Sequence, residues 1–379
     1  MNVDGKQMRP IWFDNESKTV RVIDQRRLPH ELIVQDLTSN DQVIHAIKEM
    51  YVRGAPLIGA TGALGVYVIL VQKGNQGADD AWFKRECARL RDARPTATNL
   101  AWGVDRVMEK ALNASEYGAR VAAALKEALG VVEEEAVNCR KIGEFGLSII
   151  KEIAEKKNGE PVNILTHCNA GWLACIEYGT ATAPMYTAFD AGIDIHVWVD
   201  ETRPLNQGSR LTAWELGKHG IRHTVITDNA GGHLMQHGMV DLVIVGTDRT
   251  TRAGDVANKI GTYLKALAAR DNNVPFYVAL PSSTFDWTIT DGVKDIPIEE
   301  RDPDEIKYVQ GFYDGKISSV LVPPESSPAA NHAFDVTPAR LVTGFITERG
   351  ICGAGEEQIM ALFPDKKADK KSDKRTGCA

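Results

Sequence analysis

The chain has 379 residues, of which 43% are hydrophobic and 25% charged, a composition typical of folded globular proteins rather than disordered or fibrous ones. Its length exceeds one ordinary core and indicates about two domains. With 44 Lys and Arg against 51 Asp and Glu, the formal net charge is −7, which argues against nucleic acid as a partner because phosphate backbones attract basic surfaces.

Six cysteines lie apart with no Cys-x-x-Cys pair, and polar residues follow Met1. We therefore expect no disulfide framework, zinc knuckle or secretory signal, and a cytoplasmic location. Residues 54–72 form an uncharged stretch almost long enough to span a membrane, but four glycines and Pro56 lower its hydrophobicity. The stretch is expected to be a tightly packed core helix, and no membrane contact is expected.

The first part of the chain changes its apolar spacing twice. Residues 8–36 alternate short apolar runs with turn signals, which predicts a small β-sheet. Helical spacing follows over 41–129, and the longest helical pattern covers about 121–156. The turn-like sequence 157–161 then introduces a β-branched composition. We expect a smaller N-terminal domain of a short sheet plus helices over residues 1–157.

Apolar runs and helical segments alternate regularly in the second part. Strands are expected at 162–167, 193–200, 223–228, 240–248 and 274–280, and helices at 173–190, 211–219, 233–238 and 255–269. This order predicts right-handed βαβ crossovers and hence an α/β fold with a Rossmann-like, doubly wound parallel sheet over residues 158–364. A further strand near 341–351 is expected at the sheet edge, and the Lys-rich residues 365–379 are expected to be a disordered tail.

Ligands of doubly wound sheets bind beyond the carboxyl ends of the strands, so the loops there are searched first. Cys168 follows the first strand, where the next helix would favour its thiolate; the alternative is a small buried hydrophobic residue. Asp248 ends an apolar strand, a setting that can raise a carboxyl pKa toward acid-base catalysis. Its alternatives are a helix cap or an ion pair with Arg249, and Asp255 is expected to be a simple cap.

Several segments have groups suited to an anionic or hydroxylated ligand. Asn258 and Lys259 are expected at a helix start, although Lys259 alone is equally typical of a solvated helix surface. The polar loop 200–210 concentrates donors and acceptors. The sequence RGAP at 53–56 predicts a phosphate cradle at a helix N-terminus, and RPT at 94–96 repeats the pattern.

The sequence has no Gly-x-Gly-x-x-Gly after a strand, no Walker A motif and no His-Glu-x-x-His motif. The nine histidines have no spacing typical of a metal site, and His167 is expected to orient its loop or to pack. The residues therefore predict an enzyme without cofactor or metal, with a cysteine and an aspartate above a parallel sheet and basic groups for phosphate.

Seven blocks in this order are similar to the signature blocks of 5-methylthioribose-1-phosphate isomerases: RGAPLIG, RPTATNLAW, ILTHCNAG, DETRPLNQGSRLTAWEL, ITDNAGG, GTDRTTRAGDVANKIGTY and PFYVALPSSTFD. The resemblance covers about residues 9–362. It implies an aldose-ketose isomerase of methionine salvage that converts 5-methylthioribose 1-phosphate into its ketose 1-phosphate, acts on a small phosphorylated pentose and forms a homodimer. The superfamily also includes 5-deoxyribose-1-phosphate and ribose-1,5-bisphosphate isomerases and translation initiation exchange-factor subunits.

The resemblance implies that Cys168 and Asp248 are catalytic. The substrate-binding residues that it implies are Arg53, Gly54, Ala55, Arg94, Gln207, Asn258 and Lys259. Trp172 and Thr247 depart from the family pattern, which leaves the 5-substituent of the substrate open. The alternatives are a 5-deoxyribose-1-phosphate isomerase, if Trp172 crowds out a methylthio group, and a non-catalytic sugar-phosphate-sensing or translation-regulatory relative. A bisphosphate substrate would need a further cationic site that the sequence does not locate.

Overall fold

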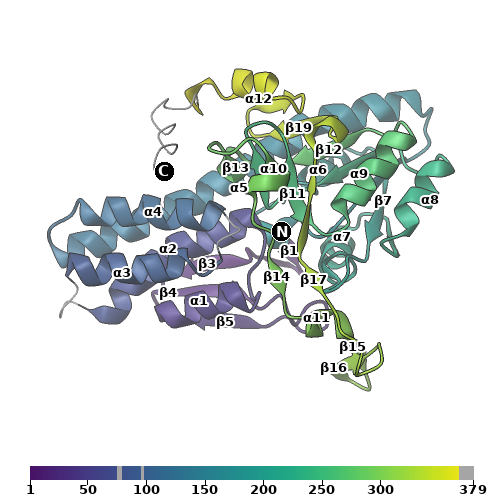
Figure 1. Cartoon of the computed structure of the whole chain (residues 1–379). Coiled ribbons are helices and arrows are strands. Elements are labelled where there is room, and N and C mark those ends of the chain that lie inside the picture. Colours follow the sequence, from purple (N-terminus) through teal and green to yellow (C-terminus); the bar gives the residue numbers. More distant parts are fainter. Residues whose placement is uncertain (75–78, 95–97, 367–379) are drawn as a thin grey trace, which may run out of the picture.

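The computed structural model describes residues 1–74, 79–94 and 98–366, so residues 367–379 of the expected tail and residues 95–97 of the second cradle motif lie outside the described residues. A helical half on a small sheet stands beside an α/β half built around a larger sheet (Figure 1). The predicted α/β class is confirmed. The domain boundary expected after residue 157 stays a prediction.

The N-terminal half begins with a hairpin and a three-stranded antiparallel sheet. Its strands are β1 (Asn2–Val3), β2 (Lys6–Gln7), β3 (Ile11–Asp14), β4 (Thr19–Ile23) and β5 (Val34–Leu37). In β4, Val20 and Val22 are buried while Thr19 and Arg21 are partly exposed, the period of two that a sheet with one covered face requires. The sequence predicts a small sheet here, but neither its number of strands nor the hairpin.

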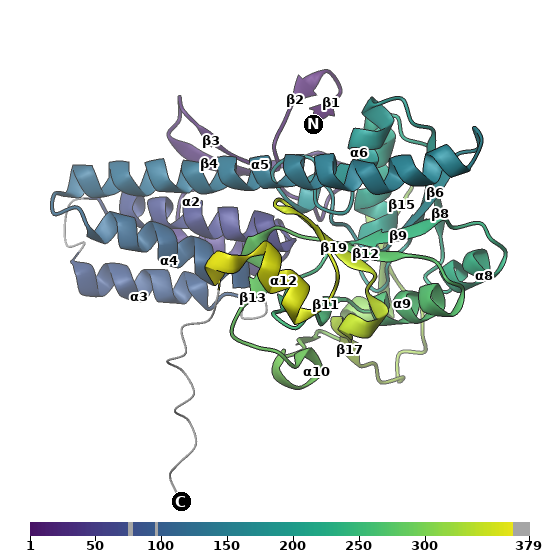
Figure 2. The ribbon, with the colours of Figure 1, turned by 90° about the horizontal axis from the view of Figure 1, so that it is seen from above.

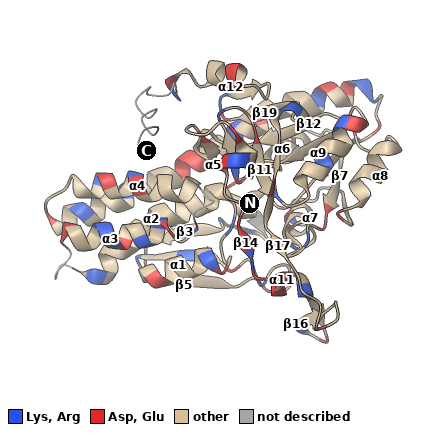
Figure 3. Ribbon diagram, in the orientation of Figure 1, with Lys and Arg blue, Asp and Glu red and all other residues tan. Residues whose placement is uncertain are grey.

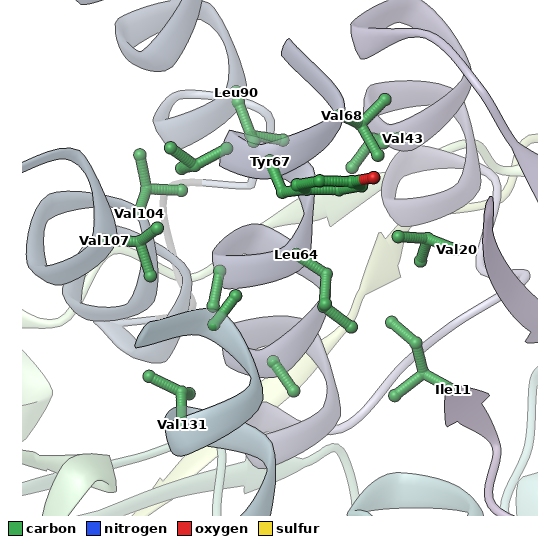
Figure 4. Packing of buried hydrophobic residues seen from close by; sticks show 14 of the residues in the cluster. Ile11, Val20, Val43, Leu64, Tyr67, Val68, Leu90, Val104, Val107 and Val131 are labelled. Atoms are coloured by element: carbon green, nitrogen blue, oxygen red, sulfur yellow. The ribbon is translucent and has the colours of Figure 1, made fainter. Parts of the chain in front are cut away.

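Five helices complete this half: α1 (Asn40–Lys48), α2 (Ala55–Lys73), α3 (Asp80–Arg91), α4 (Thr98–Leu112) and α5 (Tyr117–Lys156). Helix α2 lies at their centre, and side chains from both sheet and helices surround its Leu64, Tyr67 and Val68 (Figure 4). By length and composition α2 could cross a membrane, but 89% of its most apolar window is buried inside the protein. It is the core helix that the sequence predicts.

Glycines allow α2 and α4 to approach closely. A Cβ on Gly103 of α4 would lie 2.3 Å from the carbonyl oxygen of Gly59 in α2. A Cβ on Gly59 would in turn lie 3.0 Å from the carbonyl oxygen of Asn99. Backbone therefore packs against backbone, and a larger residue at either glycine would push the two helices apart.

The larger sheet has the strand order β20-β19-β12-β9-β6-β7-β8. Its strands are β6 (Val162–Thr166), β7 (Ile195–Asp200), β8 (His223–Ile226), β9 (Leu242–Val245), β12 (Phe276–Ala279), β19 (Gly344–Thr347) and β20 (Gly350–Cys352). All pairs are parallel except the one that adds β20 at the edge. In chain order the six parallel strands read 3-2-1-4-5-6, the Rossmann arrangement, which confirms the predicted sheet.

Helices cover both faces of this sheet. They are α6 (Ala183–Asp190), α7 (Ala213–His219), α8 (Ala230–Gln236), α9 (Thr262–Asp271) and α12 (Glu356–Leu362). Ile164 and Leu242 pack with α5, α6 and α7 on one face, whereas their neighbours Leu165 and Val243 pack with α8, α9 and α12 on the other. The chain leaves β6 toward one edge and β9 toward the other, so a crevice forms beyond the carboxyl ends of these two strands.

Helix α5 runs along both halves of the molecule (Figure 2). Its first part packs on α2 and α4, and its last part packs on α6 and β19. Gly143 and Gly146 allow the second contact, since Cβ atoms there would lie 2.5 Å from Thr187 Oγ1 and 2.4 Å from Pro184. A single rigid element therefore joins the helical half to the large sheet.

The prediction of a helix over residues 173–190 is wrong for the first half of that range. The chain forms a single 3₁₀ turn at Trp172–Ala174 and an irregular loop, and α6 starts only at Ala183. Tyr178 and Gly179 both have positive φ, 59° and 83°, which reverses the chain where a helix would have to continue.

The prediction of a helix over residues 255–269 is also wrong for the first half of that range. This region belongs to a second sheet of order β13-β10-β11-β18, made of β10 (Arg249–Thr251), β11 (Val256–Lys259), β13 (Phe285–Asp286) and β18 (Phe334–Thr337). Asp255 does not cap the helix that follows it, α9; its carboxylate accepts hydrogen bonds from the amides of Gly292 and Ala339, the first residues of two short helices distant in sequence. Asp335 of β18 instead accepts from the amides of Gly261 and Tyr263 at the start of α9.

The remaining elements are α10 (Gly292–Asp295), β14 (Glu300–Arg301), α11 (Asp304–Lys307), β15 (Tyr308–Tyr313), β16 (Lys316–Leu321) and β17 (Asn331–His332). The β15–β16 hairpin projects from the body of the molecule (Figure 1). Basic and acidic residues alternate over the outer helices (Figure 3), as the mixed composition suggests.

Replacement of Gly103 by alanine tests the α2–α4 contact. We expect Gly103→Ala to lower the free energy of unfolding by about 1–3 kcal/mol through overpacking. Gly130→Ala is the matched control, because Gly130 is an exposed residue of α5 and a Cβ there would meet nothing within 4 Å. It should raise stability by about 0.5–1 kcal/mol. Urea denaturation measures both, and equal effects would contradict the close contact.

Candidate functional site

All nine residues that the resemblance implies lie around one cavity, at the crevice beyond β6 and β9. They are Arg53, Gly54, Ala55, Arg94, Cys168, Gln207, Asp248, Asn258 and Lys259. The cavity measures about 550 Å³, including its open mouth. The start of α2 closes it from the helical half, and β11 and β18 close it from the second sheet. Residues from both halves are therefore needed to form it.

Cys168 follows β6 with a positive φ of 67°. Its amide donates to Thr202 Oγ1 at 2.8 Å, and its carbonyl oxygen accepts from the hydroxyl of Thr212 at 2.7 Å. The helix expected directly after Cys168 is absent, so the predicted effect of a helix N-terminus on the thiol is wrong. The half-buried side chain lines the cavity instead of packing in a core, which argues against the purely structural interpretation.

Asp248 follows β9, and its amide donates to the carbonyl oxygen of Ala257 at 2.9 Å. The next element is strand β10, so Asp248 caps no helix. The guanidinium of Arg249 lies 3.7 Å from the carboxylate of Asp286. Burial raises the pKa of Asp248, and the positive charges of Lys259, Arg94 and Arg53 oppose this shift. The carboxyl group therefore keeps a proton to higher pH than an exposed aspartate.

Asn258 and Lys259 lie on strand β11, not at the helix start that the sequence predicts. The Lys259 ammonium lies 4.5 Å from the centroid of the Phe334 ring, its pairing partner on β18. Burial lowers the pKa of Lys259, while the charges of Cys168 and Asp248 oppose this shift. Lys259 is thus a buried lysine that lines the same cavity as the two candidate catalytic groups, which excludes the solvated-helix alternative.

The residues after Arg53 form the N-terminus of α2, as predicted, and this end of the helix lines the cavity. Gly54 has φ 93°, and a Cβ there would lie 2.5 Å from Ala174, so only glycine fits. Backbone amides at a helix start attract anions. Arg94 is buried with its Nε 3.8 Å from Glu299, and burial lowers its pKa. Two arginines and a helix N-terminus therefore meet at one end of the cavity.

A buried network that the sequence does not reveal holds Arg53. Its guanidinium donates to the carbonyl oxygen of Asn169 at 2.7 Å and to the Asn169 side chain. The Asn169 amide donates to Glu215, which also accepts from the amide of Leu173 at 3.3 Å. Burial raises the pKa of Glu215 to about 7, although these hydrogen bonds and Arg53 oppose the shift. Glu215 lies on a predicted helix, but only the tertiary fold brings it beneath the cavity.

A second buried network supports the other side of Cys168. His167 Nε2 donates to the carbonyl oxygen of Ile260 at 2.9 Å, and Nδ1 lies 2.8 Å from Asp200. Among the described residues, His167, Asp200 and Asp228 are grouped closely enough to hold a metal ion. The ammonium of Lys265 lies 3.1 Å from Asp200 and donates to the Asp228 carbonyl oxygen, so a protein cation already interacts with this group. His167 orients its loop, as the sequence suggests.

The two residues that depart from the family pattern have different positions. Trp172 is fully buried and stacks on Trp214 with 6.2 Å between ring centroids, and it is absent from the cavity wall. The structure therefore gives no support to the condition, crowding by Trp172, under which a 5-deoxyribose-1-phosphate isomerase is favoured. Thr247 lines the cavity, but its hydroxyl donates to the backbone carbonyl oxygens of Arg249 and Ala257. It thus presents little free hydrogen-bonding capacity to a ligand.

Comparison with known proteins supports one family. A sequence model of the initiation factor 2 subunit family matches residues 51–353. A methylthioribose-1-phosphate isomerase of Desulfosudis oleivorans is 64% identical over 365 residues, which cover 96% of this chain and 99% of that protein. The crystal structure of 5-methylthioribose 1-phosphate isomerase from Pyrococcus horikoshii OT3 is 35% identical, with TM-score 0.79 and coverage of 95% and 97%. That of translation initiation factor eIF-2B, subunit delta, from A. fulgidus is 39% identical, with TM-score 0.76 and coverage of 94% and 100%.

Glu215 makes stability depend on pH. Its pKa is raised from 4.5 to about 7 in the folded chain, so the unfolded chain loses this proton first as the pH rises. Between pH 4.5 and 7 the group should lower the free energy of unfolding by up to about 3 kcal/mol. Glu215→Gln should remove this part of the pH slope, measured by urea denaturation at several pH values. The exposed Glu152→Gln is the control, and an unchanged slope in Glu215→Gln would contradict the assignment.

Proposed function

The chain belongs to the initiation factor 2 subunit family, and we propose that it is an aldose-ketose isomerase that converts 5-methylthioribose 1-phosphate into 5-methylthioribulose 1-phosphate in methionine salvage. The observation that carries this proposal is the single cavity in which a thiol, a proton-retaining carboxyl group and several cations meet. The isomerase names of relatives that match almost the whole chain support it.

The phosphate group binds at the cationic end of the cavity. Arg53, Arg94 and the amides at the start of α2 supply positive charge and hydrogen-bond donors there. Because both arginines are buried, their attraction for a phosphate is weakly screened by water. Arg53 is already fixed by its hydrogen bonds to Asn169, so its side chain loses little conformational entropy when the phosphate binds.

The phosphate on the anomeric oxygen prevents spontaneous ring opening, so the protein must open the ring. Asp248 donates its proton to the ring oxygen as the bond from C1 to that oxygen breaks. The raised pKa of Asp248 keeps the proton available, and Lys259 stabilises the carboxylate that remains. The proton of the C2 hydroxyl returns to Asp248 when C2 becomes the ketone.

Hydrogen must also move from C2 to C1. Cys168 can take the proton from C2 to give an enediol and return it to C1, which completes the isomerisation. In the alternative, a hydride passes directly from C2 to C1, and Cys168 and Asp248 only shape and polarise the site. A substrate that fills the cavity displaces water from it, which strengthens the electrostatic interactions in either route.

One relative favours a second candidate function. The A. fulgidus structure, 39% identical, is named a translation initiation factor subunit, and a binding protein of that kind would hold a sugar phosphate without turnover. A fold shared by both groups does not decide between them. The buried groups around Cys168 and Asp248 favour catalysis, since a sensor needs no proton-retaining carboxyl group. The homodimer implied by the resemblance and the cytoplasmic location expected from the cysteines and the polar start of the sequence stay predictions, and light scattering measures the oligomeric state.

Loss of either catalytic group tests the proposal. We expect Cys168→Ala and Asp248→Asn each to lower kcat/KM on 5-methylthioribose 1-phosphate by about 10²–10⁴-fold, because each removes a group that moves a proton. Cys352→Ala is the control, since Cys352 lies on β20 outside the cavity. Binding of the substrate to wild-type protein without turnover would instead support the sensor.

Solvent deuterium distinguishes the two routes for hydrogen. Proton transfer through Cys168 exchanges the proton with solvent, so the product formed in D₂O should contain deuterium at C1. A hydride shift keeps the original hydrogen. Mass spectrometry or proton NMR of the product after single turnovers measures this: deuterium at C1 excludes a pure hydride shift, and product without deuterium would contradict the expected exchange through Cys168.

A further inference from the structure

His167, the residue before Cys168, lies in the wall of the catalytic cavity and contacts two further strand ends. Its side chain is fully buried. Nδ1 lies 2.8 Å from Oδ2 of Asp200, the last residue of β7, and Nε2 lies 2.9 Å from the carbonyl oxygen of Ile260, directly after β11. Since β7 belongs to the large sheet and β11 to the second sheet, this ring joins the two sheets at the cavity.

Both nitrogens of the ring act as hydrogen-bond donors. A carbonyl oxygen can only accept, so Nε2 carries a proton. The oxygen of Asp200 that faces Nδ1 also lies 3.1 Å from the ammonium of Lys265. A cation at this distance favours the ionised carboxylate, which likewise only accepts. Nδ1 therefore carries a second proton, and the ring of His167 is an imidazolium held between two acceptors.

The groups around the ring are suited to a positive charge. Asp228, which follows β8, lies 3.9 Å from Nδ1, and its carbonyl oxygen accepts from Lys265 on α9. Burial raises the pKa of Asp335 on β18, and the charge of His167 is among the effects that oppose this shift. A buried charge is tolerated where opposite charges and hydrogen bonds surround it. These carboxylates and Asp200 together offset the two buried cations.

The carbonyl oxygen that Nε2 contacts belongs to a rigid turn. Ile260 follows Lys259 directly, and the hydroxyl of Thr262 donates to the carbonyl oxygen of Lys259 at 2.6 Å. Gly261 has φ 103°, and a Cβ there would lie 3.1 Å from Cε1 of His167. The turn that carries Lys259 therefore packs directly on the ring.

Resting on the proposed function, we propose that His167 is a positioning residue of the isomerase. By donating at both nitrogens, it holds the loop of Cys168, on the large sheet, against the turn of Lys259, on the second sheet. The thiol and the ammonium thereby keep the relative position that either route of hydrogen transfer requires. Such placement matters because a displacement of about 1 Å at a reacting group can lower a rate about 10²-fold.

Two amide variants separate the two donors of His167. A glutamine nitrogen can take the place of Nε2, and an asparagine nitrogen the place of Nδ1. His167→Asn should therefore lose the bond to Ile260 and lower kcat on 5-methylthioribose 1-phosphate about 10²-fold. KM should change little, because the arginines still hold the phosphate. His167→Gln keeps the bond to Ile260 and should keep most of kcat.

A second histidine provides the matched control. The exposed His237 also contacts a carbonyl oxygen, that of His233, with 2.8 Å between Nδ1 and the oxygen, but it lies outside the cavity wall. His237→Asn should leave both kcat and KM unchanged.

Stability measurements distinguish positioning from folding. Each variant of His167 leaves one buried acceptor without its donor, the carbonyl oxygen of Ile260 in His167→Asn and the carboxylate of Asp200 in His167→Gln. Urea denaturation should therefore show lower stability for both. Only His167→Asn should lower kcat strongly, so the same kcat in both variants would overturn the positioning role.

Nitrogen NMR of the wild-type protein, labelled with ¹⁵N-histidine, gives a test that depends neither on activity nor on the folding of a variant. We expect N–H signals from both ring nitrogens of His167 at neutral pH, and a single N–H signal would overturn the proposal. No turnover of the sugar phosphate by wild-type protein would instead overturn the proposed isomerase activity, while both N–H signals would still be expected. The two failures are therefore distinct.

Discussion

The bridge between Arg53 and Asn169 is the interaction on which the site depends. Arg53 precedes α2 in the helical half, and Asn169 follows β6 in the sheet, so this one buried contact ties the anion-binding end to the catalytic loop. Asn169 is itself fixed by Glu215. Loss of one member leaves a buried charge or amide without a partner. This lowers the free energy of unfolding far more than loss of an exposed pair does. The close approach of Gly54 to Ala174 reinforces the same junction.

The sheet topology explains why the chemistry is concentrated at one place. Cys168 and Asp248 follow the two strands at which the strand order reverses, and the crossovers leave those strands in opposite directions. No crossover covers the space between them, so a ligand can occupy it. The second sheet then brings Lys259 over this opening from β11, with Phe334 of β18 against its ammonium group. The cavity is closed by an addition to the Rossmann sheet rather than by that sheet itself.

The same scaffold serves proteins named as isomerases and a protein named as a translation factor. Two functions on one scaffold require that the residues around the cavity, rather than the fold, decide between turnover and binding.

The order of the strands and helices of the large sheet and the central helix α2 were predictable from sequence, because apolar periodicity is a local property of the chain. The candidate site residues came from the loops at the strand ends together with the resemblance of the ordered sequence blocks. Two half-helices were mispredicted. Residues 173–182 form a loop because Tyr178 and Gly179 reverse the chain, and residues 256–259 form a strand because β10 and β18 supply partners that are distant in sequence. The roles of Glu215 and Asn169 escaped prediction for the same reason. Sequence by itself determined which groups are present and in what order; only the tertiary structure decided which of them meet, because burial and pairing depend on contacts between segments far apart along the chain.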